Sequence, residues 1–318
     1  MVKLFAASAA LLLATATAAS VPDGKWPTSA GSVRLAAAQV VKAGEVFDGK
    51  MQTYERSDVS CEGQTESGAD TAVFKLEPGA TLKNVIIGKN QMEGVHCDKH
   101  DCTIENVWWD DVCEDALSVK GGSASSVTTV TGGGARSADD KVIQHNGLGT
   151  VKIDGFYGED VGKLYRSCGT CGGKARKVSM SNVLVVNPTN AVVTVNKNWG
   201  DQATLSNIWV KSSGSKKVKI CQWSQGNANG EPSMLGDGPS PSLCQYSESD
   251  VHINGNESKG NSSSSNKKND GKGNKKQGDN DDDKKQSNNS KGDKKNEGKS
   301  DKQNEGKGDK KKNDDDDN

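Results

Sequence analysis

The stretch Leu82-Lys83-Asn84-Val85-Ile86 carries an apolar-x-Asn-apolar-apolar pattern that recurs along the chain. Further copies are Ile104-Glu105-Asn106-Val107-Trp108, Met180-Ser181-Asn182-Val183-Leu184 and Leu205-Ser206-Asn207-Ile208-Trp209, and Ile153-Asp154-Gly155-Phe156 fits with Gly in place of Asn. Successive copies begin 22 residues apart (82 to 104), then 49, which is close to two periods, then 27 and 25. A period in the twenties is typical of stacked repeats.

The segments between these copies favour short β-strands. They contain β-branched runs, such as Val192-Val193-Thr194-Val195, separated by Gly and Asn turns, and they show no helical periodicity. Leucine-rich repeats have a similar period but require several leucines per unit, which are absent here. The pattern therefore predicts an all-β, parallel β-helix in which the recurring Asn extends a hydrogen-bonded ladder at a turn. A β-sandwich with coincidental Asn spacing is the alternative.

Two different segments flank this repetitive body. Residues 1–20 contain one early lysine, an apolar stretch and small residues at the end, which is typical of a secretory signal peptide. Residues 254–318 contain no aromatic or large aliphatic residue, so we predict a disordered, low-complexity polyampholyte tail. The tail contains N-x-S sequons at Asn256, Asn261 and Asn288.

Residues 21–253 are then expected to form a single domain. No segment of the sequence is apolar over the roughly 20 residues that a membrane span needs, so we expect a secreted, extracellular protein with no membrane partner. The 41 basic and 42 acidic residues nearly balance, and the bases of the body are mixed with acids, which argues against a nucleic-acid partner.

The eight cysteines all lie within this domain. In an oxidising compartment an even number of cysteines predicts disulfides, but the spacing leaves their connectivity open. Cys168-Gly169-Thr170-Cys171 could also be half of a zinc site or a redox pair, although no second CxxC or His pair completes a zinc motif.

The densest group of ionisable residues in the body lies between Glu93 and Arg166. Glu93 precedes Glu114 and Asp115 by about one period, and residues one coil apart in a β-helix lie about 4.8 Å from each other. We therefore expect Glu93 beside the Glu114-Asp115 pair on one outward face. Three clustered carboxylates suit a hard cation such as Ca²⁺, which prefers oxygen ligands.

Basic residues follow the acids at the same period. Lys141 and Lys163 are 22 residues apart (141 to 163), so they are expected to stack on neighbouring coils, and Lys120 and Arg166 belong to the same group. A calcium site beside a row of cations fits a polyanion whose carboxylates bridge to the metal. The structural alternatives are that Lys120 pairs with Asp115 and that an acidic neighbour orders Arg166.

Two long segments match a known family. Asn106-Val107-Trp108-Trp109-Asp110-Asp111-Val112-Cys113-Glu114-Asp115-Ala116 and Asp140-Lys141-Val142-Ile143-Gln144-His145-Asn146-Gly147 resemble the family 3 pectate lyases of bacteria, fungi and oomycetes, and the similarity runs from about Pro27 to Ile253. The resemblance implies a right-handed parallel β-helix that cleaves (1→4)-α-D-galacturonan, the pectate of plant cell walls, by β-elimination with Ca²⁺. We expect such an enzyme to be secreted and monomeric.

The resemblance also implies roles for individual residues. The calcium ligands fall on Glu93, Glu114 and Asp115, the base falls on Lys141, further catalytic groups fall on Lys163 and Arg166, and a substrate-binding cation falls on Lys120. Some family members have Asp where this chain has Glu93. A proton-donating acid of the family falls near Glu66.

β-Elimination removes the proton at C5 of a uronate residue, so the base must be neutral. A lysine has a usual pKa of about 10.4, and neighbouring cations disfavour its charged form. We therefore expect Lys163, Arg166 and the metal to lower the pKa of Lys141, and we expect an alkaline pH optimum.

Four further residues leave alternatives open. His96 and His145 fit either a general base or a hydrogen-bonded packing residue. Trp108 and Trp109 could stack on sugar rings, but adjacent strand residues point to opposite faces, so at most one of them faces a given surface.

Two other functions fit parts of the pattern. A non-catalytic pectin-binding or elicitor β-helix of the cell wall would keep the basic row without needing Lys141 as a base. A polygalacturonase would need paired carboxylates as acid and base, with room for water between them. Such enzymes usually show Asn-x-Asp, Asp-Asp and Gly-His-Gly segments, and Asp110-Asp111 has no Gly-His-Gly partner in this chain.

Overall fold

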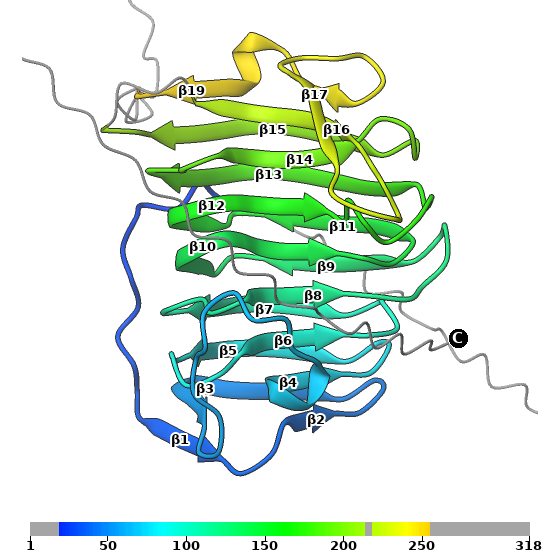
Figure 1. The fold of residues 1–318 in the computed structure, drawn as a ribbon. Helices are drawn as coiled ribbons and strands as arrows, with labels where there is room; N and C mark the ends of the chain where they lie inside the picture. Colours follow the sequence, from blue (N-terminus) through cyan, green and yellow to red (C-terminus); the bar gives the residue numbers. More distant parts are fainter. Residues whose placement is uncertain (1–18, 214–217, 255–318) are drawn as a thin grey trace, which may run out of the picture. The chain divides into compact units, whose positions relative to one another are not determined.

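Parallel β-strands stack coil upon coil in a computed structural model, which describes residues 19–213 and 218–254 (Figure 1). Within these residues the paired strands run parallel, except for the antiparallel pair of β16 (Lys219–Gln225) and β17 (Ser233–Asp237). The helices of the described part are two 3-10 turns, Ala69–Thr71 and Glu248–Asp250. The predicted all-β, parallel β-helix is confirmed, and the β-sandwich alternative is wrong.

The strands form three ladders along the coils. The first ladder stacks β3 (Val46–Arg56), β5 (Thr81–Ile87), β7 (Thr103–Trp109), β9 (Val127–Thr131), β11 (Gly149–Asp154), β13 (Arg176–Val186), β15 (Gln202–Lys211) and β18 (Cys244–Gln245). The second ladder contains the later parts of β3, β5, β7, β13 and β15, together with β1 (Ser32–Leu35), the beginnings of β10 (Gly134–His145) and β12 (Tyr157–Ser167), and β19 (Val251–Ile253).

The third ladder carries the ionisable residues singled out above. It stacks β2 (Gln39–Val41), β4 (Ala72–Leu76), β6 (Glu93–Cys97), β8 (Asp115–Val119), the ends of β10 and β12, β14 (Ala191–Asn196) and β16. Because each coil contributes one strand to this ladder, side chains one period apart in sequence become neighbours on its surface.

The recurring asparagines bend the chain from the first ladder into the second. Asn84, Asn106, Asn182 and Asn207 all have positive φ, between 51° and 54°, a conformation that Asn tolerates better than most residues. Gly155, which replaces Asn in one copy, has φ 70°. The Asn106 amide donates to Asn84 Oδ1 at 2.9 Å, and the Asn207 amide donates to Asn182 Oδ1 at 2.8 Å. The predicted asparagine ladder is therefore confirmed.

Side chains that point into the coils form the core. The strand register of the first ladder places one buried apolar residue above the next: Leu82, Ile104, Val130, Ile153, Met180 and Leu205. Burial of each large aliphatic side chain stabilises the fold by about 1.5–3 kcal/mol. Trp109 points inward and is 1% exposed, whereas Trp108 points outward, as the alternation of strand residues requires.

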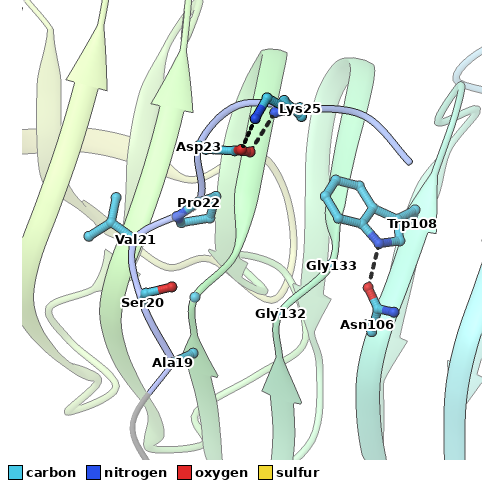
Figure 2. Close-up of a pocket in the computed structure, with 11 residues that line it drawn as sticks. Ala19, Ser20, Val21, Pro22, Asp23, Lys25, Asn106, Trp108, Gly132 and Gly133 are labelled. Carbon is cyan, nitrogen blue, oxygen red and sulfur yellow. Dashed lines mark hydrogen bonds and ion pairs between the residues drawn. The ribbon is translucent and has the colours of Figure 1, made fainter. Parts of the chain in front are cut away.

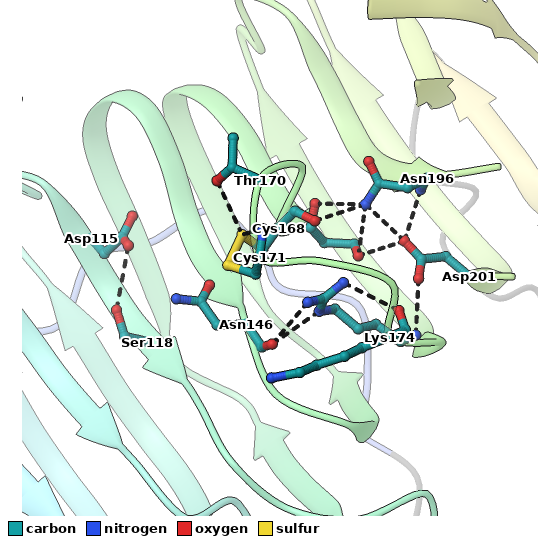
Figure 3. The surroundings of a disulfide bond; sticks show 11 residues. Asp115, Ser118, Asn146, Cys168, Thr170, Cys171, Lys174, Asn196 and Asp201 are labelled. Atoms are coloured by element: carbon teal, nitrogen blue, oxygen red, sulfur yellow. Dashed lines mark hydrogen bonds between the residues drawn. A yellow bond between two sulfur atoms is a disulfide. The ribbon is translucent and has the colours of Figure 1, made fainter. Parts of the chain in front are cut away.

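All eight cysteines form disulfides, so the predicted cross-links are confirmed. The pairs are Cys61–Cys113, Cys97–Cys102, Cys168–Cys171 and Cys221–Cys244. The CxxC pair is a disulfide at the end of β12, which excludes the half-zinc-site interpretation for this oxidised form (Figure 3).

The predicted signal peptide, apart from its last two residues, and the predicted tail, apart from Asn254, lie outside the described residues. Within the described residues, no helix is long and apolar enough to span a bilayer.

Candidate active site

Acids and bases form a single column on the outer side of the third ladder. Glu93 of β6 pairs in register with Asp115 of β8, and Lys141 of β10 pairs with Lys163 of β12. Ile143 of β10 pairs with Leu117 of β8. Two residues earlier in each strand, Lys141 therefore lies next to Asp115. The column therefore runs Glu93, Asp115, Lys141, Lys163 over successive coils, as the 22-residue spacings predicted.

The three predicted metal ligands lie together and are buried. Glu93, Glu114 and Asp115 each offer a carboxylate oxygen, and these oxygens lie within 4.8 Å of one another. Each residue is only 3% exposed. Asp115 is the first residue of β8 and Glu114 directly precedes it, so the start of this strand delivers both carboxylates, while the start of β6 delivers Glu93.

Burial makes this cluster costly to ionise without a cation. Burial raises the pKa of Asp115 well above its usual value, and Lys141 offsets only part of this effect. Burial also raises the pKa of Glu93, against the opposing effect of His96. Asp115 Oδ1 is a buried atom without a hydrogen bond, although Lys141 Nζ lies 3.1 Å away. Oxygen donors with excess negative charge fit a hard divalent cation.

Lys141 is held among these acids. Its Nζ lies 2.8 Å from Glu114 Oε1, 3.1 Å from Asp115 Oδ1 and 3.4 Å from Asp140 Oδ2. Burial by itself lowers the pKa of Lys141, but the charges of the three acids outweigh burial and raise the pKa above its usual value. For the protein charges alone the shift is therefore opposite to the expected depression, because three carboxylates lie within 3.4 Å of Nζ.

The other predicted bases differ in their partners. Lys163 forms an ion pair with Asp140, which thus bridges Lys163 and Lys141. Arg166 forms no ion pair within the described residues and donates to Ser224 Oγ at 3.3 Å. It is 9% exposed, and burial lowers its pKa. An acidic neighbour therefore does not order Arg166, contrary to the structural alternative.

Lys120 lies at the edge of the site. It directly follows β8, its backbone N–H donates to Cys97 O at 2.9 Å, and its charge contributes to the lowered pKa of Asp98. The structural alternative, an ion pair with Asp115, is wrong, because the described cation at Asp115 is Lys141.

The two histidines have opposite orientations. His96 Nδ1 lies 2.9 Å from Asp98 Oδ1, and Nε2 lies 3.3 Å from Glu93 Oε2. Burial lowers the pKa of His96, but both acids outweigh this and raise it to about 9. His145 instead points into the coil, where its Nδ1 lies 2.8 Å from the Tyr165 hydroxyl. His145 is therefore a packing residue, and His96 belongs to the site.

Sequence reasoning missed three members of the site. His96 remained ambiguous, although its position three residues after Glu93 is a usable signal. Asp140 was not predicted to bridge the two lysines. Ser118 Oγ donates to Asp115 Oδ2 at 3.3 Å and to Glu93 Oε2 at 3.4 Å, and nothing in its local sequence indicated that contact (Figure 3 shows the contact with Asp115).

Glu66 and Trp108 are the remaining positions considered from the sequence. Glu66 is exposed. It follows Cys61, whose disulfide to Cys113 attaches this segment next to Glu114. Trp108 faces a separate cavity of about 570 Å³, which the N-terminal segment forms with the Asn106 bend (Figure 2). Trp108 pairs with Gly134 in the second ladder and not in the third, so it is not a sugar platform at the acid and base column. Its indole donates to Asn106 Oδ1 at 2.7 Å.

Comparison with known proteins identifies the relatives of this site and fold. The pectate lyase family model matches residues 23–231. A probable pectate lyase D of Neosartorya fischeri is 51% identical over 239 residues, which cover 74% of this chain and 94% of that protein. Pectate lyase H of Emericella nidulans is 50% identical over 225 residues, which cover 70% of this chain and 83% of that protein.

Solved structures show the same architecture. Pectate lyase PelI from Erwinia chrysanthemi in complex with tetragalacturonic acid superposes with a TM-score of 0.57 at 32% identity, covering 67% of this chain and 68% of that chain. Pectate lyase Pel3 from Pectobacterium carotovorum superposes with a TM-score of 0.58 at 29% identity, covering 77% of this chain and 73% of that chain.

Proposed function

Because the chain belongs to the pectate lyase family, we propose that it cleaves polygalacturonate by β-elimination at the column of acids and bases on its third ladder. The observation that carries this assignment is the contact of Lys141 with Glu114 and Asp115, which joins a basic group to the proposed metal site. The reaction would leave a 4,5-unsaturated oligogalacturonide as one product.

The acid cluster is the proposed calcium site. Glu93, Glu114 and Asp115 provide buried oxygen donors. The raised pKa values of Glu93 and Asp115 and the excess negative charge of the cluster support a divalent ion over an empty cluster. When bound there, Ca²⁺ would supply a Lewis acid that neutralises the substrate carboxylate and makes the adjacent C5 proton more acidic. Ser118 and His96 keep the carboxylates of Glu93 and Asp115 in place.

Lys141 is the proposed base that removes the C5 proton. Its ammonium must first lose a proton, and Glu114 and Asp115 oppose this as long as their own charge is uncompensated. The base therefore becomes available only when those acids have another cationic partner and the pH is alkaline. This dependence supports the expected alkaline optimum on physical grounds.

The remaining cations are proposed to hold the polyanion. Arg166 has no acidic partner within the described residues, so its guanidinium can bind a substrate carboxylate in a bidentate manner. Lys163 is the proposed catalytic neighbour that stabilises charge on the reacting sugar, and Asp140 fixes its position. Lys120, at the edge of the cluster, would contact a neighbouring uronate.

We also propose that the protein acts outside the cell as a monomer. Its four disulfides support an oxidising environment, and pectate, the polysaccharide on which it would act, is extracellular.

A polygalacturonate assay tests the proposed function. The expected result is a Ca²⁺-dependent rise in ultraviolet absorbance from the unsaturated product, which EDTA abolishes. Reducing ends without that absorbance would indicate hydrolysis and overturn elimination, and binding without any product would support a non-catalytic module. Unchanged cleavage in EDTA would disprove the metal role.

A further inference from the structure

The catalytic column continues beyond Lys163 to another lysine. Lys163 pairs in register with Ala191 of β14, and Ala191 pairs with Lys219 of β16. Resting on the function proposed above, we propose that Lys219 forms a distal subsite that binds a carboxylate of the galacturonan chain two coils away from Lys163. Its ligand is thus a uronate residue remote from the bond that is cleaved.

The spacing along the column suits a polymer. Two coils correspond to about 10 Å along the stack, which is comparable to the distance between the carboxylates of alternate residues in an extended galacturonan. Ala191, between the two lysines, contributes only a methyl group, so no long side chain of that coil separates them. A uronate chain lying along the column can therefore reach both lysines.

Lys219 is partly exposed, and neutral polar side chains hold its ammonium group. Nζ donates to Gln222 Oε1 at 3.4 Å, and the Gln222 amide donates to Thr194 Oγ1 at 2.9 Å. In the neighbouring column of the same ladder, Thr194 stacks on Arg166, and Gln222 stacks on Thr194. Thr194 and Gln222 are only 1% and 2% exposed, so they support Lys219 from within the fold, and Lys219 is the partly exposed residue of this group.

Lys219 also lacks the acids that occupy the other lysines. Lys141 contacts three carboxylates and Lys163 contacts Asp140, whereas Lys219 forms no ion pair within the described residues. Its hydrogen bond to Gln222 is long, and the acceptor, an amide oxygen, is uncharged. A substrate carboxylate would replace it with a stronger, charge-assisted hydrogen bond.

The test compares substrates of different length. Lys219→Ala is expected to lower kcat/KM about three- to tenfold on hexagalacturonate and longer chains, mainly through KM, as the loss of one exposed charged contact would do. The shortest oligomer that the wild-type protein cleaves should be unaffected. Lys219→Arg should restore most of the loss, and the bond cleaved in an end-labelled hexamer should shift in Lys219→Ala.

Lys177→Ala is the matched control, because Lys177 is an exposed lysine of β13 on the first ladder. It should leave every substrate unaffected. Equal losses on short and long substrates, or no loss, would overturn the subsite. Calorimetric binding of hexagalacturonate in EDTA, where no turnover is expected, should also weaken in Lys219→Ala. If the wild-type protein is inactive but its binding of hexagalacturonate still weakens in Lys219→Ala, the lyase function is disproved and the subsite is not.

Discussion

Lys141 Nζ donates a 2.8 Å hydrogen bond to Glu114 Oε1, so the proposed base is ion-paired to a proposed calcium ligand. The pairing links the two functions of the site, because the acids that would bind calcium are the same acids that hold Lys141 protonated. A cation on the cluster and a neutral lysine are therefore mutually favourable states.

Replacing Lys141 should abolish turnover but not binding. Lys141→Ala is expected to lower kcat on polygalacturonate by about 10²–10⁴, which is the usual contribution of a positioned general base. Lys141→Arg should be equally inactive, because a guanidinium stays protonated. Hexagalacturonate binding by calorimetry should persist in both variants. Lys152→Ala, at an exposed position of β11, is the control, and wild-type turnover in Lys141→Ala would refute the assignment.

Calcium should stabilise the folded protein through the acid cluster. At a free Ca²⁺ concentration of 100 times Kd, binding stabilises the fold by about 2.7 kcal/mol, which thermal unfolding detects as a rise in Tm. Glu93→Gln should lose most of this rise, because it removes one of the three buried carboxylate charges. Without calcium, Glu93→Gln should not be less stable than the wild type, since a buried charge has been removed.

Glu105→Gln, at an exposed position of β7, is the control for that experiment and should keep the full response to calcium. A calcium-dependent rise in Tm that is the same in Glu93→Gln and in the wild type would place the ion elsewhere.

The buried His145 should make the fold sensitive to acid. Burial, followed by the charges of His100 and Arg176, lowers the pKa of His145 well below its usual value, and the Tyr165 hydroxyl is its other neighbour. In the unfolded chain His145 is protonated near its usual pKa of about 6.5, whereas in the folded chain it stays neutral at that pH. The free energy of unfolding is therefore highest above pH 6.5 and falls as the pH drops below it.

Urea unfolding between about pH 7 and pH 5 measures this effect. The free energy of unfolding of the wild type should fall more steeply than that of His145→Asn, by at most about 1.4 kcal/mol per pH unit, which corresponds to one proton. Parallel pH profiles for the two proteins would show that His145 is not the group responsible.

Asn106 should be more important for folding than its partly exposed position suggests. Asn106→Ala is expected to destabilise the fold by about 2–4 kcal/mol, because it places an alanine at φ 53° and removes the hydrogen bonds to Asn84 and Trp108. Asn106→Gly should cost less, since glycine accepts the backbone conformation and loses only the side-chain contacts. Denaturant midpoints of the two variants separate strain from hydrogen bonding, and equal midpoints would exclude a strain contribution.

Sequence reasoning succeeded where one period of sequence equals one coil of structure. The 22-residue spacings predicted that Glu93 would lie beside Asp115 and that Lys141 would lie beside Lys163, and both pairs are in register. The recurring Asn predicted a ladder at a bend, because few other residues combine a tolerance for positive φ with a side-chain amide.

Charge balance could not be predicted in the same way. The sequence suggested that cations surround Lys141, yet three carboxylates lie within 3.4 Å of its Nζ and reverse the direction of its pKa shift. Such shifts depend on distances between side chains of different coils, which change steeply with rotamer and burial. The same is true of the disulfide pairs, which join cysteines that are 3 to 52 residues apart.

By itself the sequence determined the parallel β-helix, the family resemblance and which acids and bases lie one period apart, because periodicity and motif are properties of the chain order. Only the tertiary structure decided that His145 points inward and His96 outward, that Asp140 bridges two lysines, and that Lys219 extends the column without an acidic partner. Those facts depend on which face of a coil each side chain occupies and on which neighbours the adjacent coils bring to it.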